Sequence, residues 1–312
     1  MPTRDRSRFS VESLALLWAA RESGVIDALT TSAGTVEAVA ETAAIDRRAA
    51  RITVDALESM DFIKRVGDEF EITNRALGFL AKRDVRSIGR LPNALDRFSL
   101  YTDLPETMQT GAPPALPTEW TRNRLGAHDA TDEAVVRACV TAAVRAMPDA
   151  TRVLDLAGAS GVFTREFLAR GYEVTYLDTP ETVDVVRPLL SRAGAELVAG
   201  DPTDPPVENF DLVFVGDAFA GRDADEAAEI VAAAYGALEP GGTAVFVDAL
   251  HGRCSTDATT QAAVDALALG RGDLHDESTV RSWVESAGFV RQTVQDVPGT
   301  DLQSVVAERA VD

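Results

Sequence analysis

Residues 152–161 read RVLDLAGASG, an apolar run that passes directly into a turn of small residues. The run has the length of a buried strand, and such a turn can present backbone N–H groups and a helix N-terminus to a ligand. Four more apolar runs follow, separated by amphipathic helical patterns: YEVTYLD (172–178), AELVAG (195–200), FDLVFVG (210–216) and TAVFVDAL (243–250). Strands and helices in alternation predict an α/β fold with a doubly wound, mostly parallel sheet.

The last part of the chain departs from this alternation. A helical pattern, ESTVRSWVESAG (277–288), precedes two strand-like segments, FVRQTVQDV (289–297) and LQSVVAERA (302–310), which are separated by Pro298 and Gly299. Two strands joined by a short turn pair antiparallel. We therefore expect a C-terminal antiparallel hairpin.

In an open parallel sheet the ligand lies beyond the carboxyl ends of the strands, so the residues that end each strand are informative. The first strand ends in the turn from Asp155 to Gly161, and the second ends in Asp178, 23 positions after Asp155. A carboxylate at the second strand end can accept both hydroxyl groups of a ribose. The third strand ends in Gly200-Asp201, where a side chain can meet the exocyclic amine of adenine, and the fourth in Gly216-Asp217.

The N-terminal region, from Ser10 to about Ala81, has helical patterns followed by a hairpin pattern. Thr35 and Asp46 are placed to cap two successive helices, and the second helix repeats Ala50, Val54 and Leu57 along one face. This is the pattern of a helix-turn-helix. FIKRVGDEFEI (62–72) then predicts two short strands, which complete a winged-helix arrangement.

Residues between these regions connect them. We expect a winged-helix dimerisation domain at 1–85, a helical bridge at 86–148 with a Pro-rich loop, GAPPALPTEW, and a Rossmann-like domain at 149–312. Phe98, Tyr101 and Trp120 either line a substrate pocket or pack the bridge, and the sequence leaves both interpretations open.

Charge is the most unusual global property. The chain has 50 acidic and 30 basic residues, a net charge of −20, and only two lysines. The acid is dispersed rather than gathered in a tail, which is typical of a halophilic protein whose self-repulsion is screened in strong salt. The same charge disfavours nucleic acid or an anionic membrane as partners. No signal peptide or apolar span is evident, and Cys and His lack ligand spacing, so we expect a cytoplasmic protein without metal.

Several motifs together resemble a known family. VLDLAGASG, YLDTPETV, AGDPTD, FDLVFVGDAF, ALEPGGTAVFVD and VESAGF occur in the order of the class I S-adenosylmethionine-dependent methyltransferases. With the segment from GVIDAL to EITNRALGFL, the chain resembles the small-molecule O-methyltransferases that carry an N-terminal winged-helix dimerisation domain. The resemblance implies an obligate homodimer, a small-molecule acceptor and S-adenosylmethionine as cofactor. The cofactor-binding residues that we predict are Asp155, Ala157, Gly158, Gly161, Asp178, Thr179, Asp201, Pro202 and Gly216.

Two departures from the family pattern bear on the chemistry. The turn that normally reads Gly-x-Gly-x-Gly has Ala157 and Ala159 at its first two glycine positions, and Ala220 stands where the family has its histidine base. An amine, a thiolate, an acidic phenol or an enolate can accept a methyl group without that base. Asp217 and His251, both after strand ends, are the candidate catalytic residues that could replace it.

Other functions stay open. A winged helix with Arg47, Arg48 and Arg51 on its second helix is also typical of a DNA-binding regulator. The alanines in the turn and at position 220 also fit a non-catalytic homologue that keeps the fold, and perhaps the cofactor, as a structural or partner-binding protein. A nicotinamide-dependent oxidoreductase is disfavoured, because it gives no role to LEPGG or to the Gly-Asp pairs after the later strands.

Overall fold

The computed structural model describes residues 9–31, 34–76, 85–217 and 219–311. The end of the segment EITNRALGFL and Ala218 of FDLVFVGDAF lie outside these residues. The described chain forms two compact units, one from residues up to Thr102 together with Pro117–Ala130, the other from Asp103–Leu116 together with residues from Thr131 onward. Residues 86–148, expected as a bridge, therefore contribute to both units.

The first unit begins with the elements that the N-terminal pattern predicts. Thr35 caps α3 by accepting a hydrogen bond from the Ala38 N–H, and Asp46 caps α4 through the Ala49 N–H. Ala50, Val54 and Leu57 are buried on one face of α4, as predicted. An antiparallel hairpin follows. The elements are α1 (Val11–Glu22), α2 (Val25–Thr31), α3 (Val36–Thr42), α4 (Arg47–Ser59), β1 (Ile63–Val66) and β2 (Glu69–Ile72).

Three more helices complete the first unit: α6 (Val85–Ile88), α7 (Leu91–Thr102) and α9 (Trp120–Asp129). A buried carboxylate on α7 connects this helix to α1 and to α9. Asp96 is only 2% exposed and accepts hydrogen bonds from Arg21 (2.7 Å) and from the Asn123 amide (2.8 Å). Pairing and hydrogen bonding offset the cost of burying this charge. The sequence did not predict α9.

The second unit contains a seven-stranded sheet in the order β5-β4-β3-β6-β7-β9-β8. The strands from β3 to β7 are parallel, and β9 runs antiparallel to both β7 and β8, so the predicted mostly parallel sheet and C-terminal hairpin are confirmed. The long strand β7 begins five residues earlier than TAVFVDAL suggested. The strands are β3 (Arg152–Leu156), β4 (Glu173–Asp178), β5 (Glu196–Ala199), β6 (Phe210–Gly216), β7 (Leu238–Asp248), β8 (Arg291–Asp296) and β9 (Gln303–Glu308).

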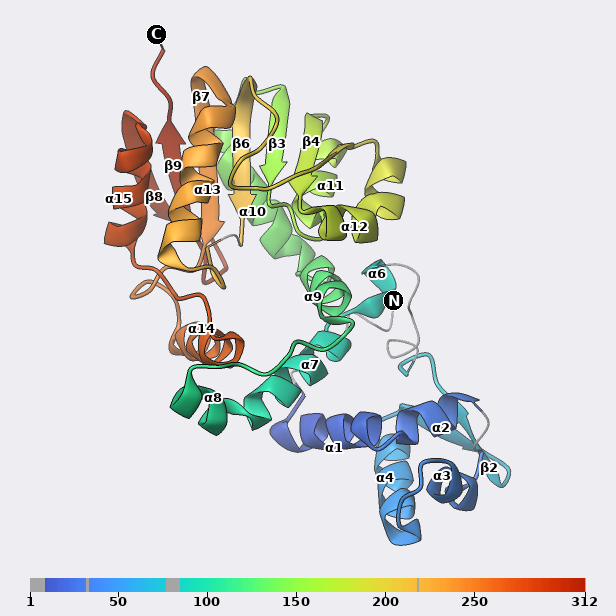
Figure 1. Ribbon diagram of the computed structural model, residues 1–312. Coiled ribbons are helices and arrows are strands. Elements are labelled where there is room, and N and C mark those ends of the chain that lie inside the picture. The colour runs from blue at the N-terminus through green and yellow to red at the C-terminus, as the bar shows by residue number, and fades with distance from the viewer. Residues whose placement is uncertain (1–8, 32–33, 77–84, 218, 312) are drawn as a thin grey trace. The chain divides into compact units, whose positions relative to one another are not determined.

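Helices cover both faces of this sheet (Figure 1). α13 (Ala224–Ala237) and α15 (Glu277–Ala287) pack against one face, and α10 (Glu133–Ala146) and α11 (Val162–Ala169) against the other. Alternate residues of the central strands enter the two cores, which is the period-two pattern of a strand buried on both sides. The layered order confirms the Rossmann-like fold.

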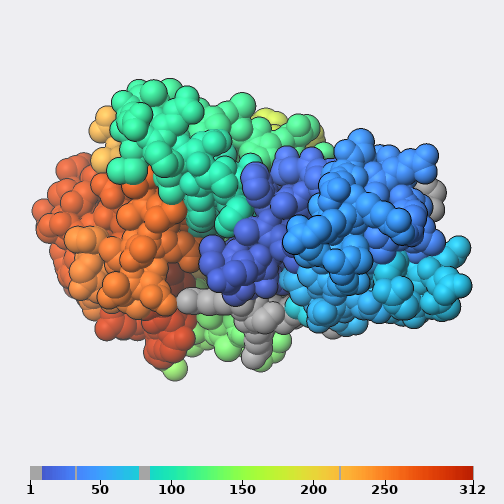
Figure 2. Space-filling model, turned by 90° about the horizontal axis from the view of Figure 1, so that it is seen from below, coloured from blue at the N-terminus to red at the C-terminus, as the bar shows by residue number. Residues whose placement is uncertain are grey.

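The remaining helices of this unit are α8 (Leu104–Thr110), α12 (Pro180–Ala193) and α14 (Thr256–Leu269). α8 and α14 pack together beyond the carboxyl edge of the sheet (Figure 1). The sequence did not predict α14, which buries only Ala268 and leaves most of its residues at the surface seen in Figure 2.

None of the helices in the described residues is long and apolar enough to cross a membrane. In the same part of the chain, no group of three His, Cys, Asp or Glu residues could hold a metal ion.

The acidic composition predicts that the stability of the fold depends on the salt concentration. Exposed ion pairs such as Arg51–Asp55 contribute little and weaken in salt, whereas a net charge of −20 repels itself throughout the folded state. Screening by salt should therefore weaken the repulsion between acidic residues more than it weakens the ion pairs. We expect the urea midpoint of unfolding to rise between about 0.1 M and about 2 M KCl. A midpoint that stays constant or falls would contradict the halophilic interpretation.

Candidate functional site

The turn after β3 has an unusual backbone. It lies where the chain order of the sheet reverses, between β3 and β6, which is the usual ligand position in such sheets. Three of its residues are left-handed: Ala157 (φ 57°), Ala159 (φ 48°) and Gly161 (φ 70°). A left-handed alanine costs about 1–2 kcal/mol. The two alanines thus keep the backbone path for which glycine is the ordinary residue.

Residues of β4 hold this path in place. The Ala159 N–H donates to the Asp178 carboxylate (2.9 Å), and the Ala159 carbonyl accepts from the Tyr176 hydroxyl (2.5 Å). Tyr176 also explains Gly158, because a Cβ added there would lie 2.6 Å from the tyrosine ring. Two hydrogen bonds and one close packing contact therefore hold the turn against β4.

Asp155, near the end of β3, is fully buried beneath the turn. Its carboxylate accepts a hydrogen bond from the Thr164 hydroxyl of α11. Gly161 is the N-cap residue before α11, and a Cβ added there would meet the Leu190 side chain at 2.6 Å. These two predicted residues fasten strand, turn and helix together.

The predicted residues after β4 and β5 lie beside this turn. Asp178 is buried and also accepts from the Thr179 N–H (2.7 Å), while Thr179 caps α12. The Gly200 N–H donates to the Asp178 carbonyl (3.0 Å), which brings the ends of β4 and β5 together. Asp201 is exposed, and hydrogen bonds from Thr203 hold the pKa of its carboxyl below the ordinary value. Pro202 is buried next to it.

The end of β6 is shaped by close packing. A Cβ at Gly216 would lie 2.7 Å from the Phe163 ring, so core packing alone requires glycine there. Asp217 follows with a left-handed backbone (φ 51°) and is exposed. Its N–H donates to the Val247 carbonyl (2.9 Å), which places it next to the end of β7.

Sequence reasoning did not assign Asp248, the residue that ends β7. This carboxylate is 4% exposed and accepts hydrogen bonds from the backbone N–H groups of Phe219 (2.7 Å), Ala220 (3.2 Å) and Ala249 (2.8 Å). Burial, and then the charge of Asp217, raise its pKa to about 7. Its place at a strand end was the only signal, because two of its three hydrogen-bond donors, Phe219 and Ala220, lie 29 and 28 residues earlier in the chain.

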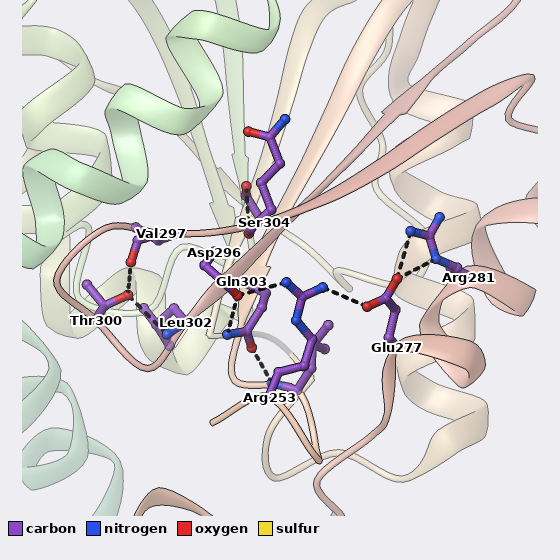
Figure 3. A network of polar contacts seen from close by, with 11 residues as sticks. Arg253, Glu277, Arg281, Asp296, Val297, Thr300, Leu302, Gln303 and Ser304 are labelled. Atoms are coloured by element: carbon purple, nitrogen blue, oxygen red, sulfur yellow. Dashed lines mark hydrogen bonds and ion pairs between the residues drawn. The ribbon is translucent and has the colours of Figure 1, made fainter. Parts of the chain in front are cut away.

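His251 lies two residues before Arg253, which belongs to a network of polar contacts (Figure 3). Arg253 pairs with Glu277 (2.6 Å) and Asp296 (2.8 Å), and the Gln303 side chain accepts from the Leu250 N–H (2.9 Å). The His251 N–H donates to the His275 carbonyl. Within the described residues the exposed His251 side chain makes no hydrogen bond, so the structure joins it neither to Asp217 nor to Asp248.

Comparisons with known proteins agree with this arrangement. Residues 153–242 match the family described as "Methyltransferase domain". This domain contains β3 to β6, α13 and the start of β7, and hence all the predicted cofactor-binding residues.

Solved structures extend the likeness beyond the methyltransferase domain to 95% of the chain. The human N-acetylserotonin methyltransferase in complex with SAM is 18% identical (TM-score 0.67, 94% of that chain covered). PigF with SAH is 15% identical (TM-score 0.72, 96% covered), and the mitomycin 7-O-methyltransferase MmcR is 18% identical (TM-score 0.70, 94% covered). At these identities the likeness concerns the fold, which is that of the class I methyltransferases. No curated protein sequence matches the chain.

The left-handed alanines give a prediction about stability. Glycine at position 157 or 159 removes the steric cost, so we expect Ala157→Gly and Ala159→Gly each to raise the free energy of unfolding by up to about 1 kcal/mol. Ala263→Gly, in exposed helix α14, is the matched control and should lower it by about 0.5–1 kcal/mol. Equal losses in all three variants in urea unfolding would show that the turn is not strained.

The raised pKa of Asp248 gives a prediction about pH. Since its folded pKa, about 7, lies above the ordinary 3.8, the folded state keeps a proton that the unfolded state has lost. This carboxyl therefore lowers the free energy of unfolding as the pH rises from about 4 to about 7. Asp217→Asn removes the repulsion and should make that fall smaller than in the unmodified protein. Identical pH profiles from chemical unfolding would contradict the coupling.

Proposed function

We propose that this protein transfers a methyl group from S-adenosylmethionine to a small organic acceptor. The observation that carries the proposal is the juxtaposition, within a methyltransferase domain, of the turn at 157–161 with Asp178 and Asp201 at the carboxyl edge of the sheet. Several of the solved structures with this fold contain SAM or SAH.

The residues fit that cofactor in their chemistry. The turn keeps its left-handed path despite Ala157 and Ala159, so backbone N–H groups and the start of α11 can face the ligand. Asp178 would accept the ribose hydroxyl groups, and Asp201, which stays ionised, would meet the adenine amine. When bound, S-adenosylmethionine supplies a methyl group already activated by the sulfonium charge. The chain then has to position the acceptor and remove its proton.

We also propose that the transfer proceeds without a histidine base. Ala220 is exposed at the position expected for that base, and the His251 side chain lies on a separately fixed loop. A positioned base contributes on the order of 10²–10⁴ in rate. Either another side chain at the carboxyl edge of the sheet acts as the base, or the acceptor reacts without a base.

Surface charge bears on the alternative of a DNA-binding regulator. On α4, Arg47 pairs with Glu37 and Arg51 pairs with Asp55. Acidic neighbours therefore neutralise the charge of two of the three arginines on which the DNA-binding alternative rested. Phosphate binding needs uncompensated positive charge. This favours a small-molecule acceptor over nucleic acid. The winged-helix name for this unit, the three-part domain division, the homodimer and the cytoplasmic location remain predictions.

Cofactor binding tests the proposal. We expect heat in calorimetric titrations with S-adenosylmethionine and S-adenosylhomocysteine in molar KCl. Asp178→Asn replaces the charged carboxylate that would accept the ribose hydroxyl groups. This variant should bind both compounds at least about tenfold more weakly. Glu173→Gln, at the exposed opposite end of β4, is the control and should leave both unchanged. No heat with either compound at about 50 μM protein would overturn the proposal.

A further inference from the structure

The loop that carries Ala220 is held from two sides. This loop, residues 219–223, lies between β6 and α13 at the carboxyl edge of the sheet. On one side, the Phe219 and Ala220 N–H groups donate to the Asp248 carboxylate at the end of β7. On the other side lies the segment 270–276, which connects α14 to α15. The loop is therefore fixed in position although the histidine expected at position 220 is absent.

The backbones of the 219–223 loop and the 270–276 segment approach each other closely at two glycines. Gly272 has a left-handed backbone (φ 85°), and a Cβ added there would lie 2.5 Å from the Gly221 Cα atom. The Gly272 N–H also donates to the Asp223 carboxylate (2.9 Å). Asp223 is the N-cap residue of α13, yet its carboxylate makes no capping hydrogen bond to that helix. An acid that would ordinarily cap a helix connects the loop to the segment instead.

The His275 side chain makes a further contact with the loop. It is 8% exposed, and its Nε2 atom lies 3.2 Å from the Arg222 carbonyl oxygen. A carbonyl oxygen only accepts hydrogen bonds, so Nε2 is the atom that carries the proton. The imidazole ring packs edge-on against Trp283 of α15, with centroids 4.8 Å apart. Trp283 also contacts the Phe219 ring (5.7 Å), so one tryptophan supports both the histidine and the first residue of the loop.

These contacts carry local costs that packing alone does not require. Helix α13 begins without a side-chain cap, because the Asp223 carboxylate is bound to the other segment. A buried imidazole needs a hydrogen-bond partner, whereas a phenylalanine would fill the same space without one. Supporting hydrogen bonds of this kind are what holds a functional position in place. The arrangement therefore points to a requirement for the position of the loop.

We propose that His275 is a positioning residue for methyl transfer: by donating to the Arg222 carbonyl, it holds the 219–223 loop as a fixed wall of the acceptor site. This inference rests on the proposed function. His275 does not itself touch the acceptor, because its ring is buried against Trp283. A displacement of about 1 Å in such a wall can lower a rate on the order of 10²-fold, so an anchored loop matters even without a base at position 220.

Amide hydrogen exchange tests the anchor. The isotope-labelled full chain is followed by NMR in molar KCl, with and without S-adenosylhomocysteine. His275→Phe keeps an aromatic ring but removes the donor, so the Phe219 and Ala220 N–H groups should exchange at least about tenfold faster. His275→Gln keeps an N–H group near the position of Nε2 and should restore slow exchange. The Ala249 N–H, which lies outside the loop, is the internal reference and should not change.

Two alanine variants test the close approach of the backbones. Gly272→Ala places a Cβ against Gly221 and should accelerate exchange of the same two N–H groups. Gly171→Ala is the matched control, since Gly171 has a similar backbone (φ 92°) but nothing within 4 Å of an added Cβ. Both variants carry the strain of a left-handed alanine, so a difference between them reports the contact between the loop and the segment.

Binding of S-adenosylhomocysteine links the loop to the reaction. In the unmodified protein, binding should shift the amide signals of Phe219 and Ala220, because the sulfur would lie at this edge of the sheet. His275→Phe should bind the compound with an unchanged Kd, which shows that the variant is folded. If His275→Phe does not fold, Gly272→Ala and Gly171→Ala test the same anchor.

The outcomes separate the two proposals. Absence of S-adenosylhomocysteine binding to the unmodified protein overturns the proposed function, and with it the reaction that His275 would serve. Bound S-adenosylhomocysteine together with unchanged exchange of the loop in His275→Phe, or with equal exchange in Gly272→Ala and Gly171→Ala, overturns the anchor alone. Loop signals that do not respond to bound S-adenosylhomocysteine overturn the positioning role, because the loop would then lie away from the reacting atoms.

Discussion

The hydrogen bond from the Ala159 N–H to the Asp178 carboxylate connects the turn after β3 to the end of β4, and the candidate site depends on it. It holds a left-handed alanine in place, and the same carboxylate also accepts from the Thr179 N–H at the start of α12. One buried acid therefore fixes a turn and a helix start on adjacent strands. Because Asp178 is also the group expected to hold ribose, the side chain that would bind the ligand is pre-oriented by the fold.

Much of this edge could be predicted from the sequence, because each strand reads as a short apolar run that ends in a small or acidic residue. Asp155, Asp178 and Asp217 were identified in this way. Position in a strand does not reveal function, however. Gly216 is required by the Phe163 ring, and Asp155 bonds to Thr164, so packing alone accounts for residues that the pattern assigned to the cofactor.

The features that sequence reasoning missed depend on contacts between distant segments or lack a periodic pattern. Asp248 was not assigned because its hydrogen-bond donors, Phe219 and Ala220, belong to another loop. Helix α14 buries one residue and so has no apolar stripe from which to predict it. Left-handed alanines were unexpected as well, since the sequence shows only that glycines are missing. The structure shows that both alanines adopt the left-handed conformation that favours glycine.

The chain has a Rossmann-like methyltransferase fold, and we propose that the carboxyl edge of its sheet binds the cofactor, with Ala220 at the position expected for a histidine base. A crystal structure of the full chain with S-adenosylhomocysteine, grown in molar salt, tests this most directly. We predict that the ribose hydroxyl groups lie within hydrogen-bond distance of Asp178 and that the sulfur faces Asp217 and Ala220. A ligand bound away from the 157–161 turn, or with its sulfur directed away from Asp217, would contradict the account.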